Sequence, residues 1–330
     1  MARSHLTLAA LASSAVAGLD VAGAMAIGSG THGDFESALV TGADGAYWVI
    51  RIPTSERAES EQSADLVALR ALSTGIRARL PFAVSTYAGQ VPVSGTRAVV
   101  YAFVHGQRIA LEDIAPGAGL ASAIGQSIAA IHSLPTSFVA DAGLPVLSGA
   151  ELRRACLVIM DRAAATGLVP AALLGRWEGA SEDSALWQFA PTVVNGALSA
   201  DSILRNGDEV TGVLGWQGLS VGDPARDLFW LLGSPRDGVA DSAIEAYQQA
   251  RGSNDRQLRR RARLYSELEL AKWLLHGTQE RSTEIVDDAV ELLQGLADRV
   301  HDDSGSSLSH DTMPVLNVDE VEAMLDQRRA

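Results

Sequence analysis

The chain has 330 residues, of which 47% are hydrophobic and 5% aromatic, enough to bury a large core in one large or two smaller domains. Its formal net charge of -14 opposes the approach of nucleic acid or an anionic membrane, so neither is an expected partner. A single cysteine, Cys156, excludes an intramolecular disulfide framework and a cysteine-based zinc site. The scattered histidines predict no metal cluster.

Residues 6–17 form an apolar segment near the N-terminus, and its small-residue end is compatible with a secretory signal peptide. Thr7, Ser13 and Ser14 interrupt the apolar run, which weakens that interpretation. No other segment is long and apolar enough to span a bilayer. We therefore expect a cytoplasmic protein without a membrane partner.

The next part of the chain, up to about residue 104, has the pattern of a small antiparallel sheet with one helix. Leu66, Leu69 and Leu72 recur at helical spacing and predict a helix over residues 56–72. The glycine-rich turn at 42–45 separates two strand-like runs and indicates a hairpin. We expect five strands, at residues 21–27, 35–40, 47–52, 84–87 and 98–103.

Beyond residue 105 the pattern becomes helical. We expect two short strands at 203–204 and 210–214 and helices at 120–133, 150–165, 171–179, 241–251, 255–276 and 283–300. Residues 301–312 are polar and serine-rich, which predicts a flexible acidic tail. Residues 315–325 form a short amphipathic segment, which either binds a protein or folds back on the body. The expected parts are thus 1–104, 105–300 and 301–330.

Three segments carry the strongest signal: 193–204 (VVNGALSADSIL), 211–216 (TGVLGW) and 222–228 (GDPARDL). Together they resemble the aminoglycoside and macrolide phosphotransferase family, whose pattern runs HGD-L-x-x-x-N-(I/V)-L, then V-(I/V)-D-W, then G-D-P-A-x-D-L. The resemblance extends from about residue 6 to residue 300. It implies an α+β fold of the bilobal, protein-kinase-like kind, with a small antiparallel-sheet N-lobe, a hinge at His105-Gly106 and a helical C-lobe.

The chain departs from this pattern at the reactive positions. Ala197 stands where the family has the aspartate that orients the acceptor hydroxyl, and a methyl group can neither accept a proton nor orient a hydroxyl. Ser202 replaces the metal-binding asparagine, and Gly215 replaces the metal-holding aspartate. Asp201 is the only nearby acid that could stand in. The resemblance therefore predicts no metal site and no assured catalytic residue.

The supporting positions agree with the family. Asp223 and Asp227, with Pro224, match the segment that caps a helix and supports the catalytic loop, which are structural roles. His132 matches the end of a family helix, and we interpret it as structural as well. The residues with structural roles thus agree with the family pattern, while the residues with catalytic roles differ from it.

The resemblance also implies candidates for nucleotide binding in the N-lobe. Arg51 occupies the place of the basic residue that holds the phosphates, and its expected partner is Asp65, with Glu61 as second choice. A structural salt bridge without nucleotide is the competing interpretation. Gly30 lies in GSGTHG, residues 28–33, which fits a phosphate-covering loop or simply a flexible turn.

Three functions remain open. The leading hypothesis is a pseudokinase that binds a small molecule or a protein without efficient phosphoryl transfer, and whose cleft holds ATP or another nucleotide without magnesium. The alternative is an active ATP-dependent kinase for a hydroxyl of an amino sugar or macrolide, with Asp201 as the relocated acid. The third is a pure interaction scaffold without a ligand.

Overall fold

The structure is a computed structural model, and it describes residues 3–28, 34–252 and 255–302. The described chain divides into two compact units. The first takes the residues up to Leu152 together with Gln188–Ser266, and the second takes Arg153–Trp187 and the residues from Glu267 onward. The expected boundary between residues 104 and 105 lies inside the first unit. Gly30 and the expected tail from residue 303 lie outside the described residues.

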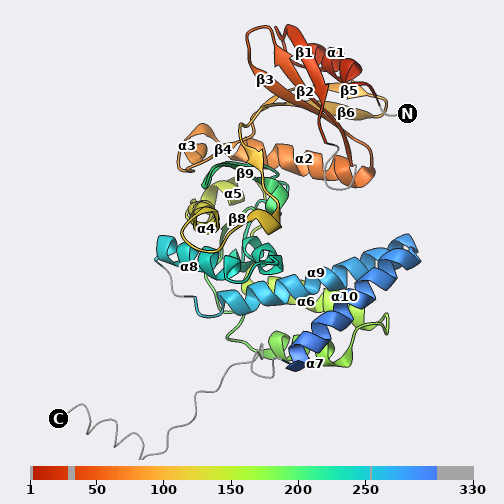
Figure 1. The fold of residues 1–330 in the computed structure, drawn as a ribbon, viewed down its shortest axis with the longest axis vertical. Helices are drawn as coiled ribbons and strands as arrows, with labels where there is room; N and C mark the ends of the chain where they lie inside the picture. Colours follow the sequence, from red (N-terminus) through yellow and green to blue (C-terminus); the bar gives the residue numbers. More distant parts are fainter. Residues whose placement is uncertain (1–2, 29–33, 253–254, 303–330) are drawn as a thin grey trace, which may run out of the picture. The chain divides into compact units, whose positions relative to one another are not determined.

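The first unit begins with a helix on an antiparallel sheet of five strands (Figure 1). Leu8, Ala9 and Ala12 of the helix pack on buried alanine, valine and isoleucine side chains from the neighbouring strands. The strand order is β1-β2-β3-β6-β5. The elements are α1 (His5–Ala15), β1 (Val21–Ala26), β2 (Phe35–Gly42), β3 (Tyr47–Pro53), β5 (Tyr87–Val93) and β6 (Thr96–Ala102).

The two faces of this sheet have different chemistry, because successive side chains of a strand point to opposite faces. On β3, Ile50 and Ile52 belong to the core under α1, so Val49 and Arg51 face the other way. Tyr101 on β6 pairs with Val49 and lies on the same face as Arg51. That second face contributes a wall of the cleft described below.

Helix α2 (Glu56–Ala71) follows β3, and its sequence defines both its start and its buried face. The Ser55 hydroxyl accepts a hydrogen bond from Ala58 N and caps the helix. The side chains at Ala58, Gln62, Leu66 and Leu69 are buried and recur at helical spacing. Asp65 directly precedes the buried Leu66 in this helix, and it lines the cleft described below.

The prediction of the fifth strand at residues 84–87 was wrong. Ala83–Val84, strand β4, pairs in parallel with β10 (Glu209–Val213) in a different sheet. The fifth strand of the first sheet is β5, which begins at Tyr87 and contains Gly89 and Pro92. Both residues are poor strand formers, and β5 is an edge strand, where a proline is tolerated.

The remainder of the first unit is mostly helical, with two small sheets in the orders β4-β10-β9-β7 and β11-β8. Helices α4 and α8 cross closely, since a Cβ on Gly125 would lie 2.0 Å from Ala243 O. The elements are α3 (Thr74–Arg77), β7 (Gln107–Arg108), α4 (Leu120–His132), α5 (Ser137–Asp141), β8 (Thr192–Val194), β9 (Ile203–Asn206), β11 (Ser220–Gly222) and α8 (Val239–Arg251).

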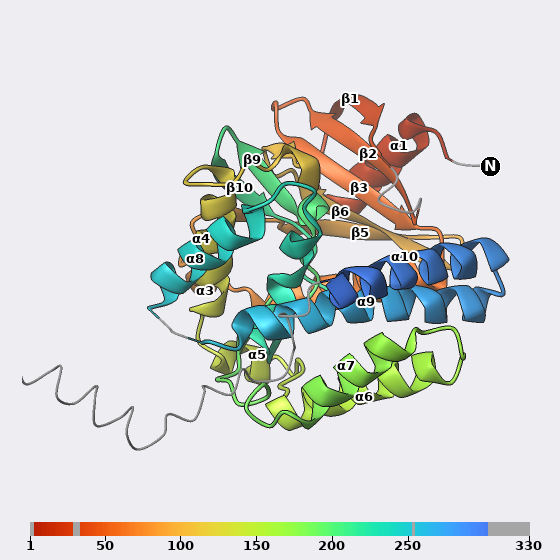
Figure 2. The same cartoon turned by 60° about the horizontal axis from the view of Figure 1, so that its bottom comes forward.

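The second unit is built from helices (Figure 2). Its buried Glu267 accepts hydrogen bonds from Arg176 Nε at 3.0 Å and from Trp177 Nε1 at 2.9 Å. These contacts neutralise a carboxylate inside the helical core. Its helices are α7 (Ala171–Glu182), α10 (Thr283–Asp302), most of α6 (Gly149–Ala164) and the C-terminal part of α9 (Leu258–Glu280).

The helices and the two short strands expected beyond residue 105 are confirmed to within a few residues. Most of the apolar segment at residues 6–17 lies in α1, which ends at Ala15 and packs on the first sheet. Among the described residues, we find no helix whose length and hydropathy would allow it to cross a bilayer.

Candidate functional site

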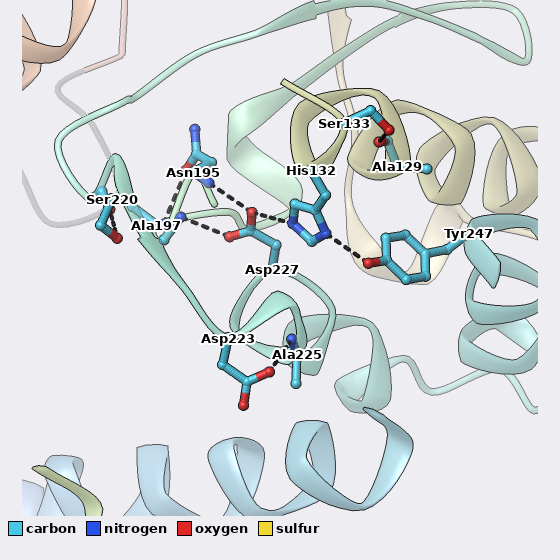
Figure 3. A network of polar contacts seen from close by, with 12 residues as sticks. Ala129, His132, Ser133, Asn195, Ala197, Ser220, Asp223, Ala225, Asp227 and Tyr247 are labelled. Atoms are coloured by element: carbon cyan, nitrogen blue, oxygen red, sulfur yellow. Dashed lines mark hydrogen bonds and ion pairs between the residues drawn. The ribbon is translucent and has the colours of Figure 1, made fainter. Parts of the chain in front are cut away.

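The loop after β8 is held by a buried carboxylate. Asp227 Oδ2 accepts a hydrogen bond from Asn195 N at 2.7 Å, and its Oδ1 accepts one from Gly196 N at 2.7 Å. His132 Nε2 lies 3.0 Å from the same Oδ2, and its Nδ1 lies 2.9 Å from the Tyr247 hydroxyl oxygen (Figure 3). Asp227 and Asn195 have no exposed surface. Asp227, held in turn by His132 of α4, thus fixes the backbone of this loop.

Asn195 provides a second brace from the position where the family has histidine. Its Nδ2 donates to Gly215 O at 2.9 Å, and its Oδ1 accepts from Ala197 N at 3.0 Å. Gly196 has a φ of 75°, and a Cβ there would lie 2.3 Å from Gly218 O. Only glycine fits at that point, because both the left-handed backbone and the close approach exclude a side chain.

Asp223 organises the segment that follows β11. Its Oδ1 accepts a hydrogen bond from Ala225 N at 2.9 Å and caps the short helix Pro224–Asp227. Its Oδ2 accepts from Arg261 Nε at 2.8 Å and from the Tyr265 hydroxyl at 3.1 Å. Burial raises the pKa of Asp223, while the Arg261 guanidinium acts in the opposite direction.

The cleft of the first unit contains two adjoining cavities of about 310 and about 380 Å³. The two share lining residues, namely Arg51, Asp65, Tyr101, Arg108, Leu214 and Gly215. Further walls of the larger one come from Ile27, Val49, Phe103, Val104 and Leu204, which make it mainly apolar. The smaller one is polar and also contains Asp34, Arg57, Glu61, Ala197, Ser199, Asp201, Ser202 and Gln217.

The three positions that differ from the family pattern lie together in the smaller cavity. Ala197 and Gly215 present no functional group there. The Ser202 hydroxyl accepts a hydrogen bond from Ser199 N at 3.2 Å, so it takes part in a capping box of the short helix Ala200–Ser202. Asp201, on that same short helix, is exposed and lines the cavity.

Two other acids of the smaller cavity, Asp34 and Glu61, pair with the same arginine. The Arg57 guanidinium bridges Asp34 at 2.5 Å and Glu61 at 2.8 Å. Among the described residues, no group of three histidine, cysteine, aspartate or glutamate side chains lies close enough together to hold a metal ion.

Arg51 lies at the junction of the two cavities. Its guanidinium carbon lies 3.8 Å from the centroid of the Phe35 ring, a cation–π contact. Burial lowers the pKa of Arg51, while Tyr101 and Asp65 act in the opposite direction. Arg51 forms no ion pair with a carboxylate of the described residues, which leaves its charge available to an anionic ligand.

Asp65 shares the cleft with Arg51 but is bonded elsewhere. Its Oδ1 accepts a hydrogen bond from Trp216 N at 2.7 Å, directly after Gly215. Burial raises the pKa of Asp65, whereas the Trp216 bond and the nearby Arg51 lower it. Arg51 and Asp65 therefore influence each other's pKa without forming a direct ion pair. Glu61, the second choice as a partner of Arg51, binds Arg57 instead.

Several cleft residues had no prior signal in the sequence. Tyr101 and Arg108 line both cavities, and Gln217 lines the smaller one. The Gln217 Oε1 atom lies 3.1 Å from the point where a Cβ on Gly215 would stand. Gln217 directly follows the motif at residues 211–216, and this position is the one clue that the sequence offered.

Comparison with known proteins shows which family has this arrangement of residues. The model of the phosphotransferase enzyme family matches residues 25–265. No curated protein matches the chain in sequence.

Several solved structures are similar to this chain over most of its length and over nearly all of their own length. The apoenzyme of macrolide 2'-phosphotransferase MphH from Brachybacterium faecium is 22% identical, with 88% of this chain and 98% of that chain covered and a TM-score of 0.72. Macrolide 2'-phosphotransferase type I is 24% identical, with 87% and 96% covered and a TM-score of 0.69. The GDP complex of aminoglycoside 2'-phosphotransferase-IIIa is 20% identical, with 90% and 99% covered and a TM-score of 0.73. These similarities establish the kinase-like fold expected from the sequence.

Proposed function

The chain belongs to the phosphotransferase enzyme family, and we propose that within it the protein is a pseudokinase that binds a nucleotide without efficient phosphoryl transfer. The observation that carries the proposal is the smaller cavity, where Ala197 and Gly215 stand in place of the two reactive carboxylates. A base that accepts the hydroxyl proton and ligands that hold magnesium are both needed for transfer. Binding needs neither.

The larger cavity fits the nucleoside part of such a ligand. Its volume of about 380 Å³ is in the range of small-molecule sites, and its apolar walls suit a planar base. Arg51, at the junction with the polar cavity, would hold a phosphate, because a guanidinium binds phosphate oxygens by charge-assisted hydrogen bonds. The aminoglycoside 2'-phosphotransferase-IIIa of similar fold was solved with GDP, which supports a nucleotide as the ligand class.

Calorimetric titration with ATP, with and without magnesium, tests this proposal. We expect saturable binding in EDTA and no gain in affinity when magnesium is added. Arg51→Gln should weaken binding about tenfold, since one charge-assisted hydrogen bond is lost. Arg70→Gln, an exposed change on α2 outside both cavities, should bind as the wild type does. Absence of heat would favour the pure scaffold, and binding that requires magnesium would contradict the proposal.

A second candidate is supported by the position of Asp201. This carboxylate lines the same cavity as Ala197 and Ser202, so it is placed to orient an acceptor hydroxyl. The protein would then be an active ATP-dependent kinase for a hydroxyl of an amino sugar or a macrolide. Robust, magnesium-dependent ATP turnover with such acceptors, lost in Asp201→Ala, would establish this function in place of the first.

The double variant Ala197→Asp with Gly215→Asp asks whether only these two carboxylates are missing. Gly215 has a φ of 70°, a conformation that aspartate adopts more readily than most residues. The atom nearest to a new Cβ there is the end of the Gln217 side chain, which can move. We expect ATP hydrolysis to appear in this variant, whereas no gain would show that the cleft has been remodelled further.

A further inference from the structure

A third cavity, of about 460 Å³, lies in the first unit and shares no lining residue with the cleft. Its walls come from the start of β8, the end of α8 and the beginning of α9. Thr192, Tyr247, Arg251 and Arg256 are the polar lining residues that matter here. Neither the nucleotide site nor the replaced catalytic positions reach this cavity.

Two of these lining side chains carry buried polar atoms without a hydrogen-bond partner. Thr192 is 6% exposed, and its hydroxyl oxygen is unpaired. Arg251 donates from Nη1 to the Ser133 hydroxyl at 2.9 Å, but its Nε is buried and unpaired. An unpaired buried polar group costs folding free energy. Both atoms are almost inaccessible to water in the unliganded chain, so a ligand with acceptor oxygens in this cavity would reach them after a small side-chain rotation.

The charges of the cavity favour an anion. Arg251 and Arg256 contribute two guanidinium groups, and Arg256 forms no hydrogen bond or ion pair with the described residues. The acid of the lining, Asp255, is compensated because its Oδ2 accepts from Arg261 Nη2 at 2.6 Å. In a chain with a net charge of -14, such a concentration of positive charge indicates a specific site.

We propose that this cavity binds a compact oxyanion group, held by Arg251, Arg256 and the Thr192 hydroxyl. Guanidinium groups bind phosphate and carboxylate oxygens with two parallel hydrogen bonds, and a threonine hydroxyl donates a third. The oxyanion group is either a phosphate or a carboxylate. The cavity is larger than such a group, so it also accommodates the rest of a small metabolite.

The test is calorimetric titration of the full chain with inorganic phosphate and, separately, with malonate, at constant ionic strength. Saturable binding is expected with at least one of them. Arg256→Gln and Thr192→Val should each weaken it about tenfold, because each removes one hydrogen bond to a charged ligand. Arg236→Gln, an exposed arginine elsewhere in the same unit, is the matched control and should bind as the wild type does.

Two features keep the result specific to this cavity. Arg51→Gln removes the positive charge at the cleft junction, so binding that survives in this variant takes place outside the nucleotide site. Thr192→Val removes an unpaired buried hydroxyl, so the unliganded variant should be at least as stable as the wild type, which shows that it folds. Binding of phosphate alone assigns a phosphate ligand, and binding of malonate alone assigns a carboxylate.

Two results would overturn the proposal. One is the absence of saturable binding with both anions. The other is wild-type affinity in both Arg256→Gln and Thr192→Val, since the anion would then bind elsewhere.

Discussion

The cleft and the polar network that supports its loop meet at the segment after β8, yet they differ in the functional groups they contain. The network keeps a full set of partners: Asp227 accepts from two loop amides, and Asp223 accepts from Arg261, Tyr265 and a backbone amide. The cleft presents no functional side chain at Ala197 and Gly215, while Asp34, Glu61 and Asp65 are bonded to neighbouring residues.

The difference follows from the separate physical roles of the two regions. The network satisfies backbone and side-chain groups that water does not reach, so a lost carboxylate there destabilises the folded state. A catalytic carboxylate in an open cleft contributes to the reaction and little to folding. Its absence leaves the fold intact, so the family's fold is compatible with the pseudokinase role proposed above.

The largest effect is expected for Asp223→Ala. The Asp223 and Arg261 side chains are both 0% exposed, so the substitution leaves a buried guanidinium without one of its carboxylates. We expect a loss of about 3–5 kcal/mol in the free energy of unfolding, measured with urea. Asp241→Ala breaks the pair with Arg259, whose side chains are 53% and 43% exposed, and should cost less than about 1 kcal/mol.

A smaller loss is expected for Asp227→Asn. The amide keeps the shape of the side chain, but its nitrogen donates hydrogen bonds and opposes the N–H of Asn195 or Gly196. We expect the free energy of unfolding to fall by about 2–3 kcal/mol. Asp201→Asn makes the same change on the exposed cleft side and should stay within about 0.5 kcal/mol. Equal losses of unfolding free energy in Asp227→Asn and Asp201→Asn would contradict the difference between the network and the cleft.

The double variant Ala197→Asp with Gly215→Asp should change stability still less. The positive φ of Gly215 makes any side chain there unfavourable, by about 1 kcal/mol relative to glycine. We expect a decrease of that size in the free energy of unfolding by urea denaturation. A loss of several kcal/mol would mean that the cleft is as tightly constrained as the network.

The smallest effect, and one of opposite sign, is expected for Asp65→Asn. Because burial raises the pKa of Asp65 in the folded state, the folded protein binds more protons than the unfolded chain around that pKa, and stability falls as pH rises. The neutral amide avoids this loss and still accepts from Trp216 N. The variant should therefore be slightly more stable at neutral pH, and the gain should vanish below the unfolded pKa of aspartate. Urea denaturation across this pH range measures it.

The sequence predicted those parts of the molecule in which local pattern determines structure. Helical periods located the helices beyond residue 105, and the glycine, tryptophan and proline positions of the motifs implied the fold. Strand β5 was missed because Gly89 and Pro92 break the pattern of a strand, and only its edge position makes them acceptable.

The candidate site was predictable to the extent that it follows the motif. The positions at Ala197, Ser202 and Gly215 do lie in one cavity together with Asp201. The bond from Trp216 N to Asp65 joins residues 151 positions apart, and no local pattern encodes such a contact. The same holds for Tyr101 and Arg108, which reach the cavity only through the pairing of the strands that carry them.

The bond between Asp65 and Trp216 also constrains how the cleft can move. It ties helix α2 to the segment after Gly215 and so acts as a latch between two walls of the cavity. A ligand that needs a wider opening must break this bond, which leaves the buried Asp65 carboxylate with the positive charge of Arg51 as its nearby compensation. Entry of such a ligand is therefore opposed by the cost of removing a hydrogen bond from a buried carboxylate.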